Sequence, residues 1–368
     1  MTLLYITNGI NGSGGLERVL SIKASYLADI MGYNVHIIKL NQKNAPLFYK
    51  FSNKLIYHDI EVKGNIIKYL SDYRKGINSV VKSIRPDIIS VCDDGYKGFY
   101  TPLIIGKHYP MVYERHASIN IFKNTDRLSF IQNLKFKLLN KLMLLGARHY
   151  DAFVVLTKGN LKEWNLKNLH VIPNPLSFYP ENPSPLKNKK VITVGNHGFQ
   201  KGYDRLLKSW KQINNKYPDW QLEVFGKIDP DKKHIKLAET LSISDSVSFF
   251  NPVKNIQDKY NEASIYAMSS RSEGFGMVLI EAMAYGLPCV SFDCPNGPRD
   301  IITNKRDGFL IENGDIDTFS LKISALIEDE KLRVKMGGNA RLKAEMYLPE
   351  KIIPQWDTLF SNLTNSNK

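Results

Sequence analysis

Two glutamates, Glu273 and Glu281, stand eight positions apart in a segment that also holds Gly274 and Gly276. The apolar residues after Gly276 recur at helical spacing, so we expect a tight glycine turn followed by a helix. Eight positions correspond to a little over two helical turns, which would put both carboxylates roughly on one face. Such a pair can bind two separated parts of one extended polar ligand.

Two further glycine loops follow strand-like runs and open helical patterns. One contains Gly14 and Gly15, and the other runs from 195 to 202 and includes Lys201. A helix that starts this way presents bare N–H groups and a positive dipole end to an anion, and Lys201 adds a cation. The first loop lacks the acidic residue that the dinucleotide-binding fingerprint places about 20 residues later. Taken alone, each loop also fits an ordinary strand–helix turn.

The elements that position these loops alternate between short apolar strands and helical patterns. This rhythm predicts parallel sheets with crossover helices, in an α/β fold of two doubly wound domains. Ligands of such domains bind at the carboxyl ends of the strands. We expect a helix over 16–31, final helices broken by Pro349 and Pro354, and strands at 3–6, 35–40, 87–91, 111–113, 152–156, 191–194, 220–226, 247–250, 265–268 and 288–292.

Length and composition agree with this division. A chain of 368 residues with 43% hydrophobic residues suits two globular domains. The Pro-, Asn- and Lys-rich stretch 173–190 predicts the connection between them. We expect an N-terminal domain over 1–178, rejoined by a C-terminal helix over 350–368, and a second domain over 187–348. No apolar run reaches about 18 residues, which argues against a transmembrane helix.

Charge is divided unevenly along the chain. Residues 1–180 hold 24 Lys and Arg against 12 Asp and Glu, a net charge of +12, whereas the remainder holds 26 against 24, a net charge of +2. The first half should therefore meet an anionic partner, and nucleic acid or an anionic membrane surface would both fit on charge alone. The N-terminus shows no basic leader, and the three cysteines have no metal or redox spacing, so we expect a cytoplasmic protein.

A basic segment over 122–150 interleaves cations with leucine, phenylalanine and isoleucine. Its six cations against Asp126 give a net charge of +5, and they are Lys123, Arg127, Lys135, Lys137, Lys141 and Arg148. An amphipathic basic helix can lie on an anionic bilayer. A core-packed helix with a solvated basic face fits the pattern equally well.

Taken in order, these motifs resemble the family-4 retaining glycosyltransferases, which have the GT-B fold of two Rossmann-like domains. The resemblance covers nearly the whole chain and is carried by Gly14–Arg18, Glu114–His116, Val171–Pro175, the loop from Val194 to Gly202, and Glu273–Glu281. Each motif is weak alone, and the ordered set is specific.

The resemblance implies roles for individual residues. Glu273 would contact hydroxyls of the donor sugar, and His116 would lie beside the reacting carbon, so these two are the expected catalytic residues. Glu281 would contact the ribose. The other expected donor-binding residues are Lys201 at the diphosphate, Gly14 and Gly15 facing it, the amides of Phe275, Gly276 and Met277, Val253 at the base, and Asn196.

One position departs from the family pattern. An arginine usually follows Val-Gly, and here Asn196 and then His197 occupy that place. Asparagine donates hydrogen bonds but brings no charge to a leaving diphosphate. Arg271 or His197 could compensate, or Lys201 and the helix dipoles could suffice. The loop 293–300 resembles one found in capsule and O-antigen transferases, and also fits a rigid Pro/Gly connector. Asp229 and Asp231 fall in an expected surface turn, where we assign no metal.

The expected activity is transfer of a hexose or N-acetylhexosamine, with retention, from a nucleotide-diphosphate sugar to a saccharide acceptor. A UDP-sugar is favoured as donor, and the resemblance favours a polyprenyl-diphosphate-linked acceptor in bacterial surface polysaccharide synthesis. We expect no cofactor and no metal. The alternatives are a nucleotide-sugar epimerase or hydrolase of the same fold and, remotely, a basic nucleic-acid-binding protein. Dispersed lysines disfavour nucleic acid as a partner.

Overall fold

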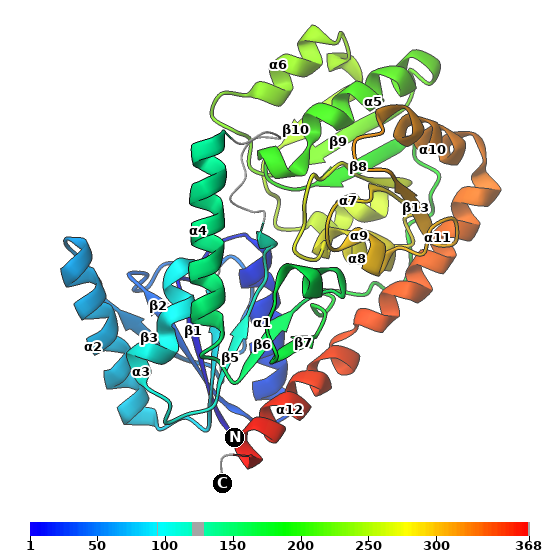
Figure 1. Ribbon diagram of the computed structural model, residues 1–368. Helices are drawn as coiled ribbons and strands as arrows, with labels where there is room; N and C mark the ends of the chain where they lie inside the picture. Colours follow the sequence, from blue (N-terminus) through cyan, green and yellow to red (C-terminus); the bar gives the residue numbers. More distant parts are fainter. Residues whose placement is uncertain (94, 120–128, 367–368) are drawn as a thin grey trace. The chain divides into compact units, whose positions relative to one another are not determined.

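The computed structural model describes residues 1–93, 95–119 and 129–366. They form two compact units: unit 1 comprises the residues up to 177 together with 349–366, and unit 2 comprises 178–348. Figure 1 shows the chain returning from unit 2 to unit 1 through its last helix. Among the described helices, none combines the length and the apolar character needed to cross a bilayer.

Unit 1 contains a seven-stranded parallel sheet with the order β3-β2-β1-β4-β5-β6-β7. The strands are β1 (Thr2–Thr7), β2 (Asn34–Leu40), β3 (Ile56–Ile60), β4 (Ile88–Cys92), β5 (Met111–Glu114), β6 (Ala152–Val155) and β7 (Leu169–Val171). The α-helices are α1 (Gly15–Asp29), α2 (Ile66–Ile84), α3 (Thr101–Ile105), α4 (Phe130–Ala147) and α12 (Pro349–Asn365).

Helices cover both faces of this sheet because side chains alternate along each strand. Leu3 and Tyr5 of β1 pack with α1 and α12, whereas Leu4 and Ile6 pack with α2, α3 and the end of α4. The strands are therefore buried on both sides, as expected for a parallel sheet.

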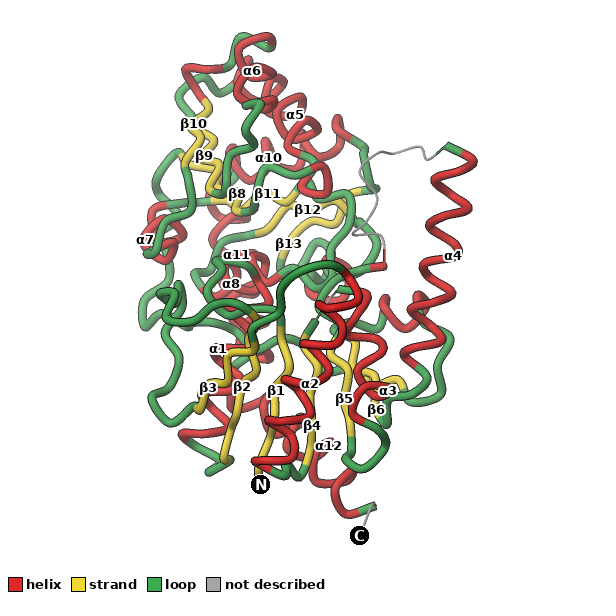
Figure 2. The backbone as a smooth tube through the Cα atoms, turned by 90° about the vertical axis from the view of Figure 1, so that its left-hand side faces the viewer, coloured by secondary structure: helices red, strands yellow, loops and turns green. Residues whose placement is uncertain are grey.

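Unit 2 contains a six-stranded parallel sheet with the order β10-β9-β8-β11-β12-β13 (Figure 2). The strands are β8 (Lys190–Val194), β9 (Gln221–Phe225), β10 (Val247–Phe250), β11 (Ile265–Met268), β12 (Cys289–Phe292) and β13 (Gly308–Ile311). The α-helices are α5 (Tyr203–Lys216), α6 (Lys233–Thr240), α7 (Ile256–Glu262), α8 (Met277–Ala284), α9 (Pro298–Ile301), α10 (Ile316–Glu328) and α11 (Glu330–Ala344).

Short 3-10 helices complete the described elements. They are η1 (Tyr96–Tyr100), η3 (Gly159–Glu163), η4 (Phe199–Lys201), η5 (Ser244–Ser246) and η6 (Glu345–Tyr347). Both sheets are parallel and doubly wound, so the predicted α/β class is confirmed.

One expected helix break is wrong. Pro354 lies inside α12, which runs without interruption from Pro349 to Asn365. Proline in a helix interior removes one backbone hydrogen bond and is unfavourable by about 3 kcal/mol or more. Burial of an apolar face on unit 1 opposes that cost, because Ile352, Ile353 and Trp356 all lie in its core.

Candidate active site

The carboxyl ends of neighbouring strands bring the predicted donor residues of unit 2 together. β8 and β11 pair side by side, and the chain leaves β8 into η4, which ends at Lys201. The chain leaves β11 into the loop that holds Glu273 and then enters α8. Strand ends of this kind meet at one edge of the sheet, where doubly wound domains bind ligands.

Lys201 and Glu273 form an ion pair at this edge. The Lys201 Nζ lies 2.7 Å from Glu273 Oε1, and the Ser270 hydroxyl donates to the same oxygen at 2.6 Å. The Ser269 hydroxyl also donates to the Lys201 backbone carbonyl at 2.8 Å, which fixes the two loops to each other. The lysine and glutamate side chains are 27% and 11% exposed, so the pair is screened from most of the solvent but remains reachable.

Two glycines shape the entrance to α8. Gly276, the residue before the helix, has a φ of 104°, a conformation that favours glycine. A Cβ at Gly297 would lie 2.1 Å from the Phe275 carbonyl oxygen, so the 293–300 loop packs directly on the backbone before α8. The first N–H groups of a helix ordinarily have no intrahelical acceptor. In α8 the Leu279 amide already donates to the Gly276 carbonyl at 2.9 Å, so the Met277 and Val278 amides are the candidate donors after Glu273.

Glu281 lies inside α8 and is fully buried. Its carboxylate accepts a hydrogen bond of 3.2 Å from the Tyr260 hydroxyl of α7. The expectation that Glu273 and Glu281 share one helix face is wrong, because Glu273 lies in the loop before the helix and only Glu281 is helical. The two carboxylates are thus held by different elements.

The residues around the missing arginine have defined partners. Asn196 accepts a hydrogen bond from the Lys227 amide at 3.1 Å. Arg271 forms a bidentate ion pair with Asp204 at 2.7 and 2.8 Å and lies over the Phe199 ring. Burial, together with the neighbouring His234, lowers the pKa of His197 to about 4, so that ring is neutral at neutral pH. His197 therefore brings no positive charge at neutral pH, and Arg271 and Lys201 are each paired with a carboxylate, Asp204 and Glu273.

Two groups of described residues have a metal-compatible composition. Cys92, Glu114 and His116 form one, and His197, Asp229 and His234 the other, with ligand atoms within 4.8 Å of one another in each. In the first, Glu114 already pairs with a lysine. In the second, the His197 ring packs edge-on against the Tyr203 and Phe249 rings, at 5.2 and 5.6 Å between centroids. The lysine pair accounts for Glu114 in the first group, whereas in the second both ring nitrogens of His197 are buried without a hydrogen-bond partner among the described residues.

In unit 1, His116 follows β5 and contacts a buried ion pair. Its Nε2 lies 3.1 Å from Glu114 Oε2, and Lys23 of α1 donates to the same oxygen. The Ser90 hydroxyl donates to the other Glu114 oxygen. Burial raises the pKa of Glu114, but the Lys23 ammonium and the His116 contact outweigh it and hold that pKa at about 2.

The remaining predicted residues lie where the strand pattern placed them. Gly14 precedes α1, and a Cβ on Gly15 would meet no atom within 4 Å, so the backbone there is open to close approach. Val253 follows β10 in unit 2 and is partly buried. Gly14, Gly15 and His116 belong to unit 1, and the other predicted site residues belong to unit 2.

Comparison with known proteins identifies the family of the chain. Residues 178–343, nearly all of unit 2, match the family model described as glycosyl transferases group 1. An uncharacterized glycosyltransferase of Haemophilus influenzae is 32% identical over 357 residues, which cover 96% of this chain and 97% of that protein. The chain is a group 1 glycosyltransferase.

One further relative and one solved structure are also similar to this glycosyltransferase. The lipopolysaccharide 1,6-galactosyltransferase of Salmonella typhimurium is 27% identical over 355 residues, 90% of each chain. The solved structure of Alr3699/HepE from Anabaena in complex with UDP superposes with a TM-score of 0.77 at 16% identity, over 98% of this chain and 100% of that one. The similarity to the Alr3699/HepE structure shows that the chain has the GT-B fold.

Three supporting residues of the glycosyltransferase escaped the sequence interpretation. Ser270 and Tyr260 contact the predicted site carboxylates Glu273 and Glu281, and Lys23 contacts Glu114, the neighbour of the predicted His116. Ser270 was detectable, because it lies three positions before Glu273 in the same loop. The sequence offered one hint for Lys23: it is a cation at a position of α1 where helical periodicity predicts a buried apolar residue. Tyr260 gave none, because its contact depends on how α7 packs against α8.

Proposed function

We propose that this glycosyltransferase moves a hexose or N-acetylhexosamine from a UDP-sugar to a saccharide acceptor with retention at the anomeric carbon. The observation that carries the proposal is the Lys201–Glu273 pair beside the first amides of α8. It puts a cation, a carboxylate and backbone N–H donors at one strand edge. A sugar diphosphate needs these three groups, the carboxylate for sugar hydroxyls and the others for phosphate oxygens.

The chemical step requires stabilisation of a departing diphosphate. Lys201 and the α8 N-terminus supply fixed positive potential where that charge develops. Glu273, oriented by Ser270, would hold the sugar hydroxyls and so fix the anomeric carbon against the acceptor. The anomeric C–O bond breaks as the acceptor oxygen bonds to the same face, and the acceptor proton passes to the leaving phosphate oxygen. This front-face route needs no enzymic nucleophile.

The other assignments follow from burial and position. Glu281 would bind the ribose hydroxyls, as the family resemblance implies, with its carboxylate positioned by the Tyr260 hydroxyl. The backbone at Val253, just after β10, would contact the base. His116 would stand beside the reacting carbon, with its ring oriented by Glu114. Gly14 and Gly15 would allow the diphosphate to approach the α1 backbone.

We further propose that the acceptor is a polyprenyl-diphosphate-linked saccharide at the inner face of the cell membrane, in synthesis of a bacterial surface polysaccharide. The net charge of +12 over residues 1–180 suits a diphosphate-bearing acceptor and an anionic surface. The Salmonella relative acts on lipopolysaccharide, as its name states, and the Anabaena protein binds UDP.

A donor screen tests the function. Purified protein is incubated with individual UDP- and GDP-sugars, with and without a bacterial polyprenyl-diphosphate saccharide extract, and nucleoside diphosphate release is measured. We expect acceptor-dependent release with one UDP-sugar and an α-linked product from an α-linked donor. Equal consumption without acceptor would instead indicate the hydrolase or epimerase alternative. If none of the donors in the panel gave nucleoside diphosphate release, the transferase proposal would be contradicted.

A further inference from the structure

Helix α4 carries a continuous apolar stripe on its exposed side. The stripe residues are Phe130, Ile131, Leu134, Leu138, Leu142 and Leu145, which are 84, 74, 61, 56, 39 and 43% exposed. At roughly 100° per residue they fall within an arc of about 120° along the helix. The opposite side, with Met143 and Ala147, packs into the core of unit 1. The stripe is therefore separate from the face that stabilises the fold.

The charges around the stripe all have one sign. α4 contains no aspartate or glutamate, and its three cations are Lys135, Lys137 and Lys141, all exposed. By the same helical geometry, Lys135 and Lys137 flank opposite edges of the stripe and Lys141 lies within it. The first turn is fixed by a reciprocal capping box between Ser129 and Gln132. α4 is a regular helix (Figure 1), so its apolar residues and lysines recur at helical spacing.

A second apolar group lies at the corresponding end of α2. Ile66 and Ile67 in its first turn are 75 and 76% exposed. α2 follows β3 and α4 follows β5, so both helices begin beyond the carboxyl edge of the unit 1 sheet.

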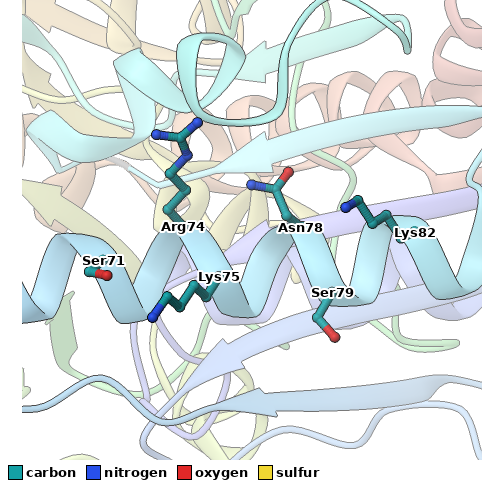
Figure 3. A pocket seen from close by; sticks show the side chains of 6 residues that line it. All are labelled: Ser71, Arg74, Lys75, Asn78, Ser79 and Lys82. Carbon is teal, nitrogen blue, oxygen red and sulfur yellow. The ribbon is translucent and has the colours of Figure 1, made fainter.

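Further along, α2 borders an open surface pocket of about 610 Å³, whose described lining holds three cations and no carboxylate. Figure 3 shows its lining: Ser71, Arg74, Lys75, Asn78, Ser79 and Lys82. Unit 1 therefore combines exposed apolar turns with a cationic side-chain cluster.

This combination distinguishes between possible occupants of the stripe. The cores of protein–protein interfaces are depleted in lysine, whereas α4 places a lysine inside the stripe and one at each edge. A lysine can bury its alkyl stem beside apolar side chains and extend its ammonium to lipid phosphates. Charge complementarity therefore favours an anionic bilayer over a second copy of the chain.

We propose that α4 lies in the interface of an anionic lipid bilayer, with the stripe toward the acyl chains and its lysines at the lipid phosphates. The helix does not cross the membrane: it lies along the surface with its apolar side immersed. The proposal deepens the proposed function, since it gives a lipid-linked acceptor a route to unit 1.

Vesicle sedimentation tests this proposal. The full chain is spun with vesicles of equal parts phosphatidylglycerol and phosphatidylcholine, and with pure phosphatidylcholine vesicles. We expect binding to the anionic vesicles and a drop of about tenfold or more in the partition coefficient for Leu134→Gln/Leu138→Gln. Leu321→Gln on α10 is the matched control, because Leu321 is 65% exposed. The variant Lys135→Gln/Lys137→Gln/Lys141→Gln should lose the preference for anionic vesicles.

Several outcomes would overturn the proposal. These are negligible binding of the wild type to both vesicle types, and unchanged binding of the stripe variant. Sedimentation velocity without lipid provides another: a dimer that the stripe variant dissociates, with vesicle binding retained, would assign the stripe to a second copy. Thermal unfolding establishes that each variant is folded. The assay contains no donor or acceptor, so its result is independent of whether transfer activity is found.

Discussion

Lys201 and Glu273, from loops 72 residues apart in sequence, meet in an ion pair of 2.7 Å at the carboxyl edge of the unit 2 sheet. Both residues have additional anchors, since the Ser269 hydroxyl donates to the Lys201 backbone carbonyl and the Ser270 hydroxyl to the Glu273 carboxylate. The loops are therefore fixed before any ligand arrives. Such preorganisation is what electrostatic stabilisation of a leaving group requires.

Removing either member of this pair should impair transfer. We expect Glu273→Gln and Lys201→Met each to lower kcat/KM by about 10² to 10³, the range found when one preorganised transition-state contact is lost. Steady-state kinetics with the donor identified in the screen would measure this. Glu262→Gln, which removes a half-exposed ion-pair partner of Lys190 elsewhere in unit 2, should leave the rate unchanged. Wild-type turnover of Glu273→Gln would remove Glu273 from the mechanism.

The buried pair between Lys23 and Glu114 should dominate the stability of unit 1. Lys23 is fully buried, with its ammonium 3.8 Å from the Trp356 ring centroid. Lys23→Met removes the ammonium from the buried Glu114 carboxylate, which keeps its His116 and Ser90 contacts, and we expect a loss of about 3–5 kcal/mol in the free energy of unfolding. Urea unfolding would measure it. The control Lys54→Met removes an exposed pair with Asp29 and should cost at most about 1 kcal/mol. Equal effects of the two variants would refute the argument.

His197 should make stability fall on mild acidification. Its pKa is about 4 in the folded protein against an ordinary 6.5, so between these values the unfolded chain binds more protons. Stability is therefore full above pH 6.5 and declines toward pH 4, by on the order of 3 kcal/mol for this group.

The variant His197→Phe keeps the ring and removes the titration. Its unfolding free energy, followed by urea titration across this pH range, should decline less steeply than that of the wild type. Part of the decline will persist, because the pKa values of His36, His58, His170 and His234 are also lowered. Identical pH slopes for the two proteins would show that His197 does not contribute.

Gly297 should tolerate no side chain. Its φ is 91°, and a Cβ would lie 2.1 Å from the Phe275 carbonyl oxygen. We expect Gly297→Ala to cost about 1–3 kcal/mol and to raise the donor KM, because the backbone before α8 must shift. Gly338→Ala in α11 is the matched control, since a Cβ there meets no atom within 4 Å. Thermal unfolding and donor titration would compare the two, and an unchanged KM for Gly297→Ala would contradict this view of the loop.

Much of the fold was predictable because long apolar runs and glycine turns are local signals. β1, β2 and β8 fall on the expected runs, and α8 begins directly after Gly276. Three strands were not predicted: β3, β7 and β13. Each lies at the edge of its sheet, and β3 has a single buried residue, Ile60, rather than a continuous buried apolar run. Their pairing depends on neighbours that local sequence does not specify.

The site could be predicted as a set of residues but not as a geometry. The motif order predicted that Lys201 and Glu273 matter, whereas their direct contact depends on β8 and β11 being neighbours. Sequence spacing also suggested that the Glu273 and Glu281 carboxylates share one helix face, whereas α8 begins only at Met277 and leaves Glu273 in the preceding loop. The sequence suggested Arg271 as one possible diphosphate ligand. Its bidentate pair with Asp204 could not be predicted, because it depends on how α5 packs against the loop that holds Arg271.

The most direct test of the donor site is a thermal shift with UDP alone. A ligand that binds the native state raises its apparent unfolding temperature. The account predicts that UDP raises the Tm of the wild type and of Glu262→Gln, and that Lys201→Met loses the shift. Absence of a shift in the wild type, or a full shift in Lys201→Met, would contradict the claim that Lys201 holds the diphosphate of a uridine nucleotide at this edge.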